Sequence, residues 1–168
     1  SGVNKTMNKT IIEITKRIKE RSKASRKEYI DLMKKVHNNK VTRADLACGN
    51  LAHAFAACAD DEKVDLSAEV KSNLAIITAY NDMLSAHKTY EDYPPKLKAS
   101  AKKYGGVAQV ASGVPAMCDG VTQGQAGMEL SLFSRDVIAL STAIGMSHQM
   151  FDGGLCLGIC DKIVPGMM

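Results

Sequence analysis

Tryptophan is absent from this chain, and aromatic residues make up only 5% of it. No run of apolar residues approaches the ~20 that a membrane-spanning helix needs, so we expect no membrane partner. The first residues are polar and charged and do not form a secretory signal. Five cysteines without such a signal indicate reduced thiols and not a disulfide framework. We therefore expect a cytoplasmic protein.

The chain is long enough for one domain with a hydrophobic core, since 45% of its 168 residues are hydrophobic. Its net charge of +4 is unevenly distributed, because residues 1–40 carry twelve Lys or Arg and only four acidic residues. A basic helical segment is compatible with nucleic-acid binding or with a solvated helix face. Aromatic residues do not alternate with these charges, so we expect no nucleic-acid partner and keep nucleic-acid binding as the weakest alternative.

The N-terminal part of the chain is predicted to be helical. Apolar residues at helical spacing indicate a helix over residues 8–37, with a break possible in the polar stretch 19–28. A second helix is expected from Thr42, as its N-cap, to Cys58, and a short helix at 64–72. The expected organisation is a tag scar at 1–6, a helical region at 7–63, and the start of a truncated α/β domain at 64–168.

Three short apolar runs follow, and helices separate them. The strands are expected at 74–79, 107–111 and 155–159, and the helices at 96–103 and 129–148. This alternation predicts an α/β fold with three layers: a mostly parallel sheet with helices on both faces, preceded by the helical arm. Ligands bind beyond the carboxyl ends of such strands, and we expect the three strand exits to lie side by side.

Two Cys-Asp pairs stand where strands are expected to end: Cys118-Asp119 and Cys160-Asp161. A soft thiolate beside a hard carboxylate suits a site that holds both an iron–sulfur cluster and a divalent cation. Cys160 is the stronger candidate for a cluster ligand, although the residues alone favour a small buried hydrophobe. Cys156 lies four residues earlier, ~13 Å away along a strand, so we expect it in the core and not on the same metal.

Three residues of these loops suit a hard cation. Asp119 and Asp161, expected on neighbouring strand ends, can hold Mg²⁺ between them. Lys162 can pair with a carboxylate or a phosphate, or become a carbamate that supplies oxygen ligands. For Asp119, a simple turn before Gly120 is an equal alternative.

A weaker cluster follows the first expected strand. It consists of Asn81, Asp82 and His87, which we assign to substrate binding, with His87 as a phosphate ligand or an acid. The remaining histidines and cysteines of the helices are expected to have structural roles: His53, His148, Cys48 and Cys58.

Four segments together are recognisable: 46–53, 80–87, 113–124 and 160–166. They resemble the dihydroxy-acid and sugar-acid dehydratase family, and the resemblance extends over nearly the whole chain. The Cys-Asp-Gly sequence and the Asn-Asp-Met-Leu-Ser-Ala-His sequence favour the phosphogluconate branch of this family over the branched-chain amino acid branch.

The resemblance implies a hydro-lyase of the Entner–Doudoroff pathway, which removes water from 6-phospho-D-gluconate to give 2-keto-3-deoxy-6-phosphogluconate. It implies an iron–sulfur cluster that acts as a Lewis acid on the C3 hydroxyl, with 4Fe–4S favoured over 2Fe–2S. By motif match, Cys160 is a cluster ligand, and Asp119, Asp161 and Lys162 are Mg²⁺ positions, with the lysine carbamylated in some relatives. Whether this branch uses Mg²⁺ is left open. Full-length members form homodimers.

Two departures from the family pattern matter. Many relatives carry a cluster cysteine after the first strand, where residues 81–86 contain none, and Cys118 is not a usual ligand position. Family chains are also several times longer, so a further cluster cysteine, an acidic Mg²⁺ ligand and the catalytic base are expected beyond Met168. We therefore expect an N-terminal fragment that is inactive alone. The alternatives are another dehydratase of the family, or a non-catalytic fragment with an interaction role.

Overall fold

The computed structural model describes residues 7–38, 42–67 and 71–168. The chain divides into two compact units, Ser1–Lys40 and Val41–Met168. The residues that we expected to form a tag scar lie outside the described part. No helix within the described part combines the length and the apolar character of a membrane span.

The first unit consists of two helices, α1 (Lys9–Arg21) and α2 (Lys23–Asn38). The side chain of Asn8 accepts a hydrogen bond from the backbone of Thr10 and so caps α1. The predicted break falls at Ser22, whose hydroxyl donates to the Ile18 carbonyl at 2.7 Å. Neither helix buries a described residue, so the apolar stripe predicted from the sequence is exposed in both.

The second unit begins with three short helical segments. They are η1 (Arg43–Asp45), α3 (Cys48–Ala56) and α4 (Asp60–Ser67). The expected single helix from Thr42 to Cys58 is therefore two elements, because Thr42 donates its backbone N–H to the Asp45 carboxylate and closes a short turn. Cys58 is buried as expected, but the prediction that Cys48 is a packing residue is wrong, since its side chain is exposed.

The sheet contains the three predicted strands: β1 (Asn73–Thr78), β2 (Val107–Gly113) and β3 (Gly153–Leu157). All pairings are parallel, and the strand order is β2-β1-β3. This confirms the α/β fold. The central strand is almost completely buried, whereas the edge strand β3 is partly exposed. Cys156 lies on this edge strand and is exposed, so its predicted place in the core is wrong.

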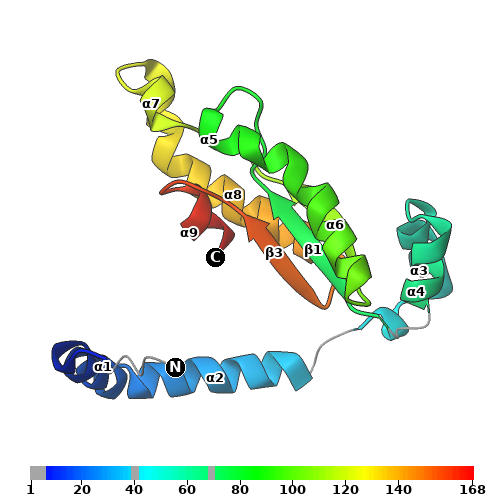
Figure 1. Cartoon of the computed structure of the whole chain (residues 1–168), viewed down its shortest axis with the longest axis horizontal. Coiled ribbons are helices and arrows are strands. Elements are labelled where there is room, and N and C mark those ends of the chain that lie inside the picture. Colours follow the sequence, from blue (N-terminus) through cyan, green and yellow to red (C-terminus); the bar gives the residue numbers. More distant parts are fainter. Residues whose placement is uncertain (1–6, 39–41, 68–70) are drawn as a thin grey trace, which may run out of the picture. The chain divides into compact units, whose positions relative to one another are not determined.

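Helices and short turns connect and flank these strands (Figure 1). After β1 come α5 (Ser85–Lys88), η2 (Thr89–Asp92) and α6 (Tyr93–Lys103). After β2 come α7 (Asp119–Thr122), η3 (Ala126–Leu130) and α8 (Ser131–Met146), and after β3 comes α9 (Ile163–Met167). The main core lies where α8 and α9 pack on the carboxyl half of the sheet, and consists of Ile77, Ala79, Val114, Ile138, Ile163 and Met167.

A buried arginine joins the amino ends of two strands. The Arg43 guanidinium donates to the Lys71 carbonyl before β1, and to the Met150 carbonyl and the Asp152 carboxylate before β3, at 2.8–3.1 Å. The Asp152 carboxylate also accepts the backbone N–H of Asn73, the first residue of β1. Sequence reasoning did not single out Arg43, because a lone arginine after a threonine carries no local signal of burial.

Candidate metal and substrate site

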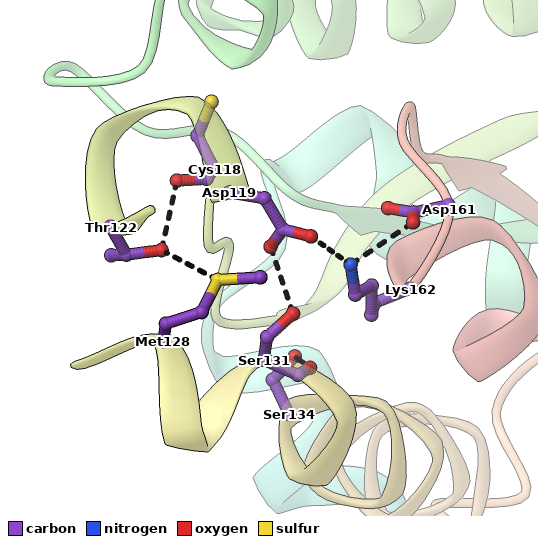
Figure 2. A network of polar contacts seen from close by, with 8 residues as sticks. All are labelled: Cys118, Asp119, Thr122, Met128, Ser131, Ser134, Asp161 and Lys162. Carbon is purple, nitrogen blue, oxygen red and sulfur yellow. Dashed lines mark hydrogen bonds and ion pairs between the residues drawn. The ribbon is translucent and has the colours of Figure 1, made fainter. Parts of the chain in front are cut away.

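The two Cys-Asp pairs lie beyond the carboxyl ends of β2 and β3. These strands are not neighbours, because β1 lies between them. The expectation that Asp119 and Asp161 occupy neighbouring strand ends is therefore wrong. Their loops nevertheless meet, because Lys162 forms ion pairs with both carboxylates (Figure 2).

Asp119 is held from two sides. It is the first residue of α7, and its Oδ1 accepts a hydrogen bond from the Ser131 hydroxyl at 2.8 Å. Ser131 is buried and is the first residue of α8, so the carboxylate is oriented by the start of the long helix. Its Oδ2 pairs with the Lys162 ammonium. Ser131 was missed by sequence reasoning, although a hydroxyl at a helix start after the Asp119 loop was an available signal.

Lys162 is the centre of this network. Its ammonium donates to Oδ2 of Asp119 and, at 3.0 Å, to Oδ2 of Asp161. The lysine side chain is only 12% exposed, compared with 33% for Asp119 and 72% for Asp161. The hydrogen bonds with Asp119 and then Asp161 raise the pKa of Lys162 above its usual value. The hydrogen bonds that Asp119 accepts from Lys162 and Ser131 lower its pKa. The Asp119 carboxylate and the Lys162 ammonium are therefore both charged at neutral pH.

Cys160 directly precedes Asp161 and Lys162 and has an unusual backbone conformation. Its φ is 88°, a left-handed conformation that a side chain other than glycine's disfavours. The side chain is exposed, so the alternative of a buried hydrophobe does not hold for it. A non-glycine residue in this region costs roughly 1–2 kcal/mol, and such strain is typical of functional positions.

Cys118 has a different setting. It is the N-cap residue of α7, with extended backbone, and its carbonyl accepts the Thr122 hydroxyl at 3.3 Å. Figure 2 shows its sulfur pointing away from Lys162 and Asp161. The two Cys-Asp pairs are therefore not equivalent: both aspartates contact the same ammonium, but the cysteines differ in backbone and exposure.

Asn81 and Asp82 are occupied by local contacts. The Asn81 side-chain oxygen accepts the backbone N–H of Met83 at 2.8 Å, which closes a turn after β1. Asp82 accepts hydrogen bonds from the Tyr80 hydroxyl at 2.7 Å and the Lys88 ammonium at 2.6 Å. Among the described residues, no hydrogen bond or ion pair joins this cluster to Asp119 or Lys162, so its assignment to substrate binding stays a prediction.

His87 is buried beneath the same loop, at 1% exposure. Neither ring nitrogen has a hydrogen-bond partner in the described part of the chain. Burial lowers the pKa of His87, and the nearby Ala79 backbone opposes this only in part, so the imidazole is neutral near pH 7. By contrast, His53 and His148 are exposed on or beside helices. The ring of His148 contacts the Gly145 carbonyl, a local structural contact.

The donor set of the Lys162 network partly fits the groups that the sequence predicts. Two carboxylates that converge on one partly buried ammonium are the kind of oxygen ligands that Mg²⁺ uses. Carbamylation requires the neutral amine, which both ion pairs disfavour. Among the described residues, no three side chains of Asp, Glu, His or Cys are placed to hold a metal by themselves. The chain therefore presents part of a metal site.

Comparison with known proteins gives a consistent result. Residues 71–168 match the family model for the N-terminal part of dihydroxy-acid/6-phosphogluconate dehydratases. The chain is 56% identical over 161 residues to a phosphogluconate dehydratase of Escherichia coli K12, which covers 96% of this chain and 27% of the relative. It is 60% identical over 157 residues to that of Rhizobium meliloti, covering 94% and 26%.

A more distant relative marks the other branch. A dihydroxy-acid dehydratase of Akkermansia muciniphila is 37% identical over 95 residues, which cover 56% of this chain and 17% of the relative. The chain spans about a quarter of the length of the phosphogluconate dehydratases that it matches. It belongs to the dihydroxy-acid/6-phosphogluconate dehydratase family.

Proposed function

We propose that this chain forms the N-terminal part of a phosphogluconate dehydratase. This enzyme is a hydro-lyase that converts 6-phospho-D-gluconate to 2-keto-3-deoxy-6-phosphogluconate. In this reaction the C3 hydroxyl and the C2 proton leave, and the resulting enol becomes the ketone. Identities of 56% and 60% to phosphogluconate dehydratases, against 37% to the dihydroxy-acid dehydratase, support this substrate. The observation that carries the site is the convergence of Asp119 and Asp161 on Lys162 beyond the ends of a parallel sheet.

In this proposal each residue of the site has a separate task. Asp119, oriented by the Ser131 hydroxyl, is the fixed carboxylate of a divalent-cation site. Asp161 is more exposed and can turn toward a cation or a substrate hydroxyl. Lys162 neutralises the two carboxylates, and a cation that replaces its ammonium would free the amine for carbamylation.

Cys160 is the proposed iron–sulfur ligand. Enzymes of this family use an iron–sulfur cluster, which supplies a Lewis acid for the departing hydroxyl. The exposed thiol at a strained backbone position, next to the carboxylates, fits one ligand of such a cluster. One thiol does not hold a cluster by itself, so we propose that the other ligands and the catalytic base belong to polypeptide corresponding to the rest of the relatives. We favour a 4Fe–4S cluster, a cytoplasmic location and a homodimer.

We also propose that the dehydratase domain begins near residue 64. The family model matches from residue 71, just before β1, which supports this boundary. The segments η1 and α3 before this boundary lie in the same compact unit as the sheet, Val41–Met168.

A chimeric enzyme tests the proposed function. In it, this chain replaces the matching quarter of the Escherichia coli phosphogluconate dehydratase, and the protein is reconstituted anaerobically with iron and sulfide. We expect turnover of 6-phosphogluconate and no turnover of a branched-chain dihydroxy acid. The opposite preference would refute the substrate assignment, and the 168-residue chain alone should be inactive.

The site assignment is tested in the same chimera with a matched pair of variants. Cys160→Ser should abolish both the visible absorbance of the cluster and activity, whereas Cys118→Ser should retain both. An unchanged spectrum in Cys160→Ser would show that Cys160 is not a ligand. Asp119→Asn should weaken any dependence on Mg²⁺ and keep the cluster, and loss of the cluster there would contradict the division between thiolate and carboxylates.

A further inference from the structure

The two edge strands of the sheet differ in how they are protected. The strand β2 lies against α4, α6 and α8, and a bulge at Ala111 interrupts its pairing with β1. Bulges, charges and covering helices are the usual means of preventing a further strand from pairing with an edge. The strand β3 pairs with β1 without a bulge, and its sequence Gly-Gly-Leu-Cys-Leu carries no charge and no proline. The β3 edge is therefore suited to accept a further strand.

The backbone groups of β3 alternate between its two sides. The Leu157 carbonyl accepts the Ala79 N–H at 3.0 Å and so points toward β1. Successive residues of a strand direct their backbone groups to opposite sides, so those of Gly154 and Cys156 point outward. Among the described residues, β3 has no strand neighbour on that side. Such a row of donors and acceptors is a template for another strand.

The surface beside this edge is apolar. A hollow of about 230 Å³ lies there, lined by Cys156, Gly158, Val164, Met167 and Met168. Figure 1 shows α9 beside β3, on the side away from β1. Leu155, on the opposite face of the strand, is also exposed. Strands with apolar side chains on both faces are typical of the interior of a parallel sheet, so the expected occupant is an apolar strand.

The position of α9 indicates the direction in which the sheet continues. Ile138 of α8 and Ile163 of α9 belong to one core with Ile77 of β1, so both helices lie on the same face of the sheet. The connection β2–α8–β3 crosses over β1 on this face, and parallel crossovers are right-handed in about 98% of cases. A second right-handed crossover on the same face advances in the same direction, which from β3 leads away from β1.

We propose that the outer edge of β3 pairs with a fourth parallel strand, which it reaches through a crossover that starts at α9. This strand belongs to polypeptide that corresponds to the rest of the relatives, because the chain spans about a quarter of their length and matches the model of their N-terminal part. The inference rests on the proposed function, in which the chain is that part of the enzyme. A second copy fits less well, because a two-fold axis would pair the two β3 strands antiparallel, whereas both pairings in this sheet are parallel.

The fourth strand would end beside the candidate site. Parallel strands have their carboxyl ends at one edge of the sheet, and Cys160, Asp161 and Lys162 closely follow the end of β3. The loop after the fourth strand therefore lies next to these three residues. It is placed where a loop can contribute further ligands to the partial metal site.

Hydrogen exchange at single amides, read by mass spectrometry, tests the pairing in the 168-residue chain and in the chimeric enzyme. The outward Cys156 amide should exchange at least about a hundredfold more slowly in the chimera. The Ala79 amide, which bonds to the inner side of β3, is the control and should be protected in both proteins. Equal exchange of Cys156 in both proteins overturns the proposal. Protection in the chimera that depends on protein concentration also overturns it, because the edge then pairs with a second copy.

A pair of proline variants distinguishes strand pairing from simple burial. Proline lacks a backbone N–H, so Cys156→Pro removes an outward donor, whereas Leu155→Pro removes a donor to β1. In the 168-residue chain, slow exchange at Ala79 should persist in Cys156→Pro and be lost in Leu155→Pro. In the chimera, the Gly154 amide should exchange at least about tenfold faster in Cys156→Pro than in Cys156→Ala. Equal rates in these two chimeras would show burial without pairing and would contradict the proposal.

The fourth strand and the proposed function fail separately, because hydrogen exchange does not depend on turnover. A chimera that is active on 6-phosphogluconate but exchanges rapidly at Cys156 refutes the fourth strand and leaves the proposed function intact. A protected Cys156 amide in a chimera that does not act on 6-phosphogluconate supports the strand and counts against the proposed function.

Discussion

The two ends of the sheet are built differently. At the amino end, the buried Arg43 guanidinium makes three hydrogen bonds that connect the segments before β1 and β3. At the carboxyl end, charged side chains stay partly exposed, Cys160 has a left-handed backbone, and the ring of the buried His87 has no hydrogen-bond partner among the described residues. The amino end is organised for stability, whereas the carboxyl end retains strain and unused polar groups where ligands of parallel sheets bind.

The largest effect is expected at the amino end. Arg43→Ala removes three hydrogen bonds, including one to the Asp152 carboxylate, and should lower the free energy of unfolding by roughly 3 kcal/mol. Urea unfolding of the 168-residue chain measures it. The control Lys96→Ala, an exposed lysine without an ion pair among the described residues, should change the midpoint little. Equal effects of both substitutions would contradict the special role of the amino end.

His87 should make the carboxyl end sensitive to acid. Its pKa is lowered in the folded state, so the unfolded chain binds the proton more tightly. Stability is therefore expected to fall as pH drops below about 6.5, the ordinary value for histidine. His87→Leu should reduce this slope in urea unfolding between pH 5 and 8, and His53→Ala, at an exposed position, should leave it unchanged. A slope that persists in His87→Leu would assign the titration to another group.

Cys160 should be replaceable with a gain in stability. Cys160→Gly relieves the left-handed backbone and should raise the free energy of unfolding of the apo chain by about 1 kcal/mol. Cys118→Gly is the matched control: its backbone is extended, so glycine adds only unfolded-state entropy there and should destabilise. The comparison would fail if both substitutions acted in the same direction.

The smallest effect is expected for the Asp119–Lys162 ion pair, because Asp119 is partly exposed and its contribution is screened by solvent. The lowered pKa of Asp119 means that its contribution is present above about pH 4 and is lost as pH falls below that value. Asp119→Asn should therefore be less stable than the unaltered chain at pH 7, and the difference should shrink progressively as pH falls below about 4. An undiminished difference at pH 3 would point to lost packing instead of lost charge.

The positions of the strands can be predicted from the sequence more accurately than the exposure of individual side chains. The three apolar runs correspond to the three strands, although β3 begins two residues earlier than expected. Cys48 and Cys156 were expected in packed positions because cysteine is usually buried, yet both are exposed. For Cys156 the cause is that β3 is an edge strand, and strand order cannot be read from an apolar run.

For the candidate site too, the sequence indicates the residues but not the contacts between them. Asp119, Asp161 and Lys162 could be nominated from the sequence because each follows an expected strand. Their contact through a single ammonium depends on two loops that meet beyond the intervening β1, and on the Ser131 hydroxyl, which no motif indicated.

The sequence by itself determined the family, the alternation of strands and helices, and the types of residue at the strand exits, because these depend on local pattern and on motifs. Only the tertiary structure decided which of those residues meet, which cysteine is strained, and where Arg43 is buried. The physical reason is that contacts between distant segments depend on strand order and loop path, which local propensities do not encode.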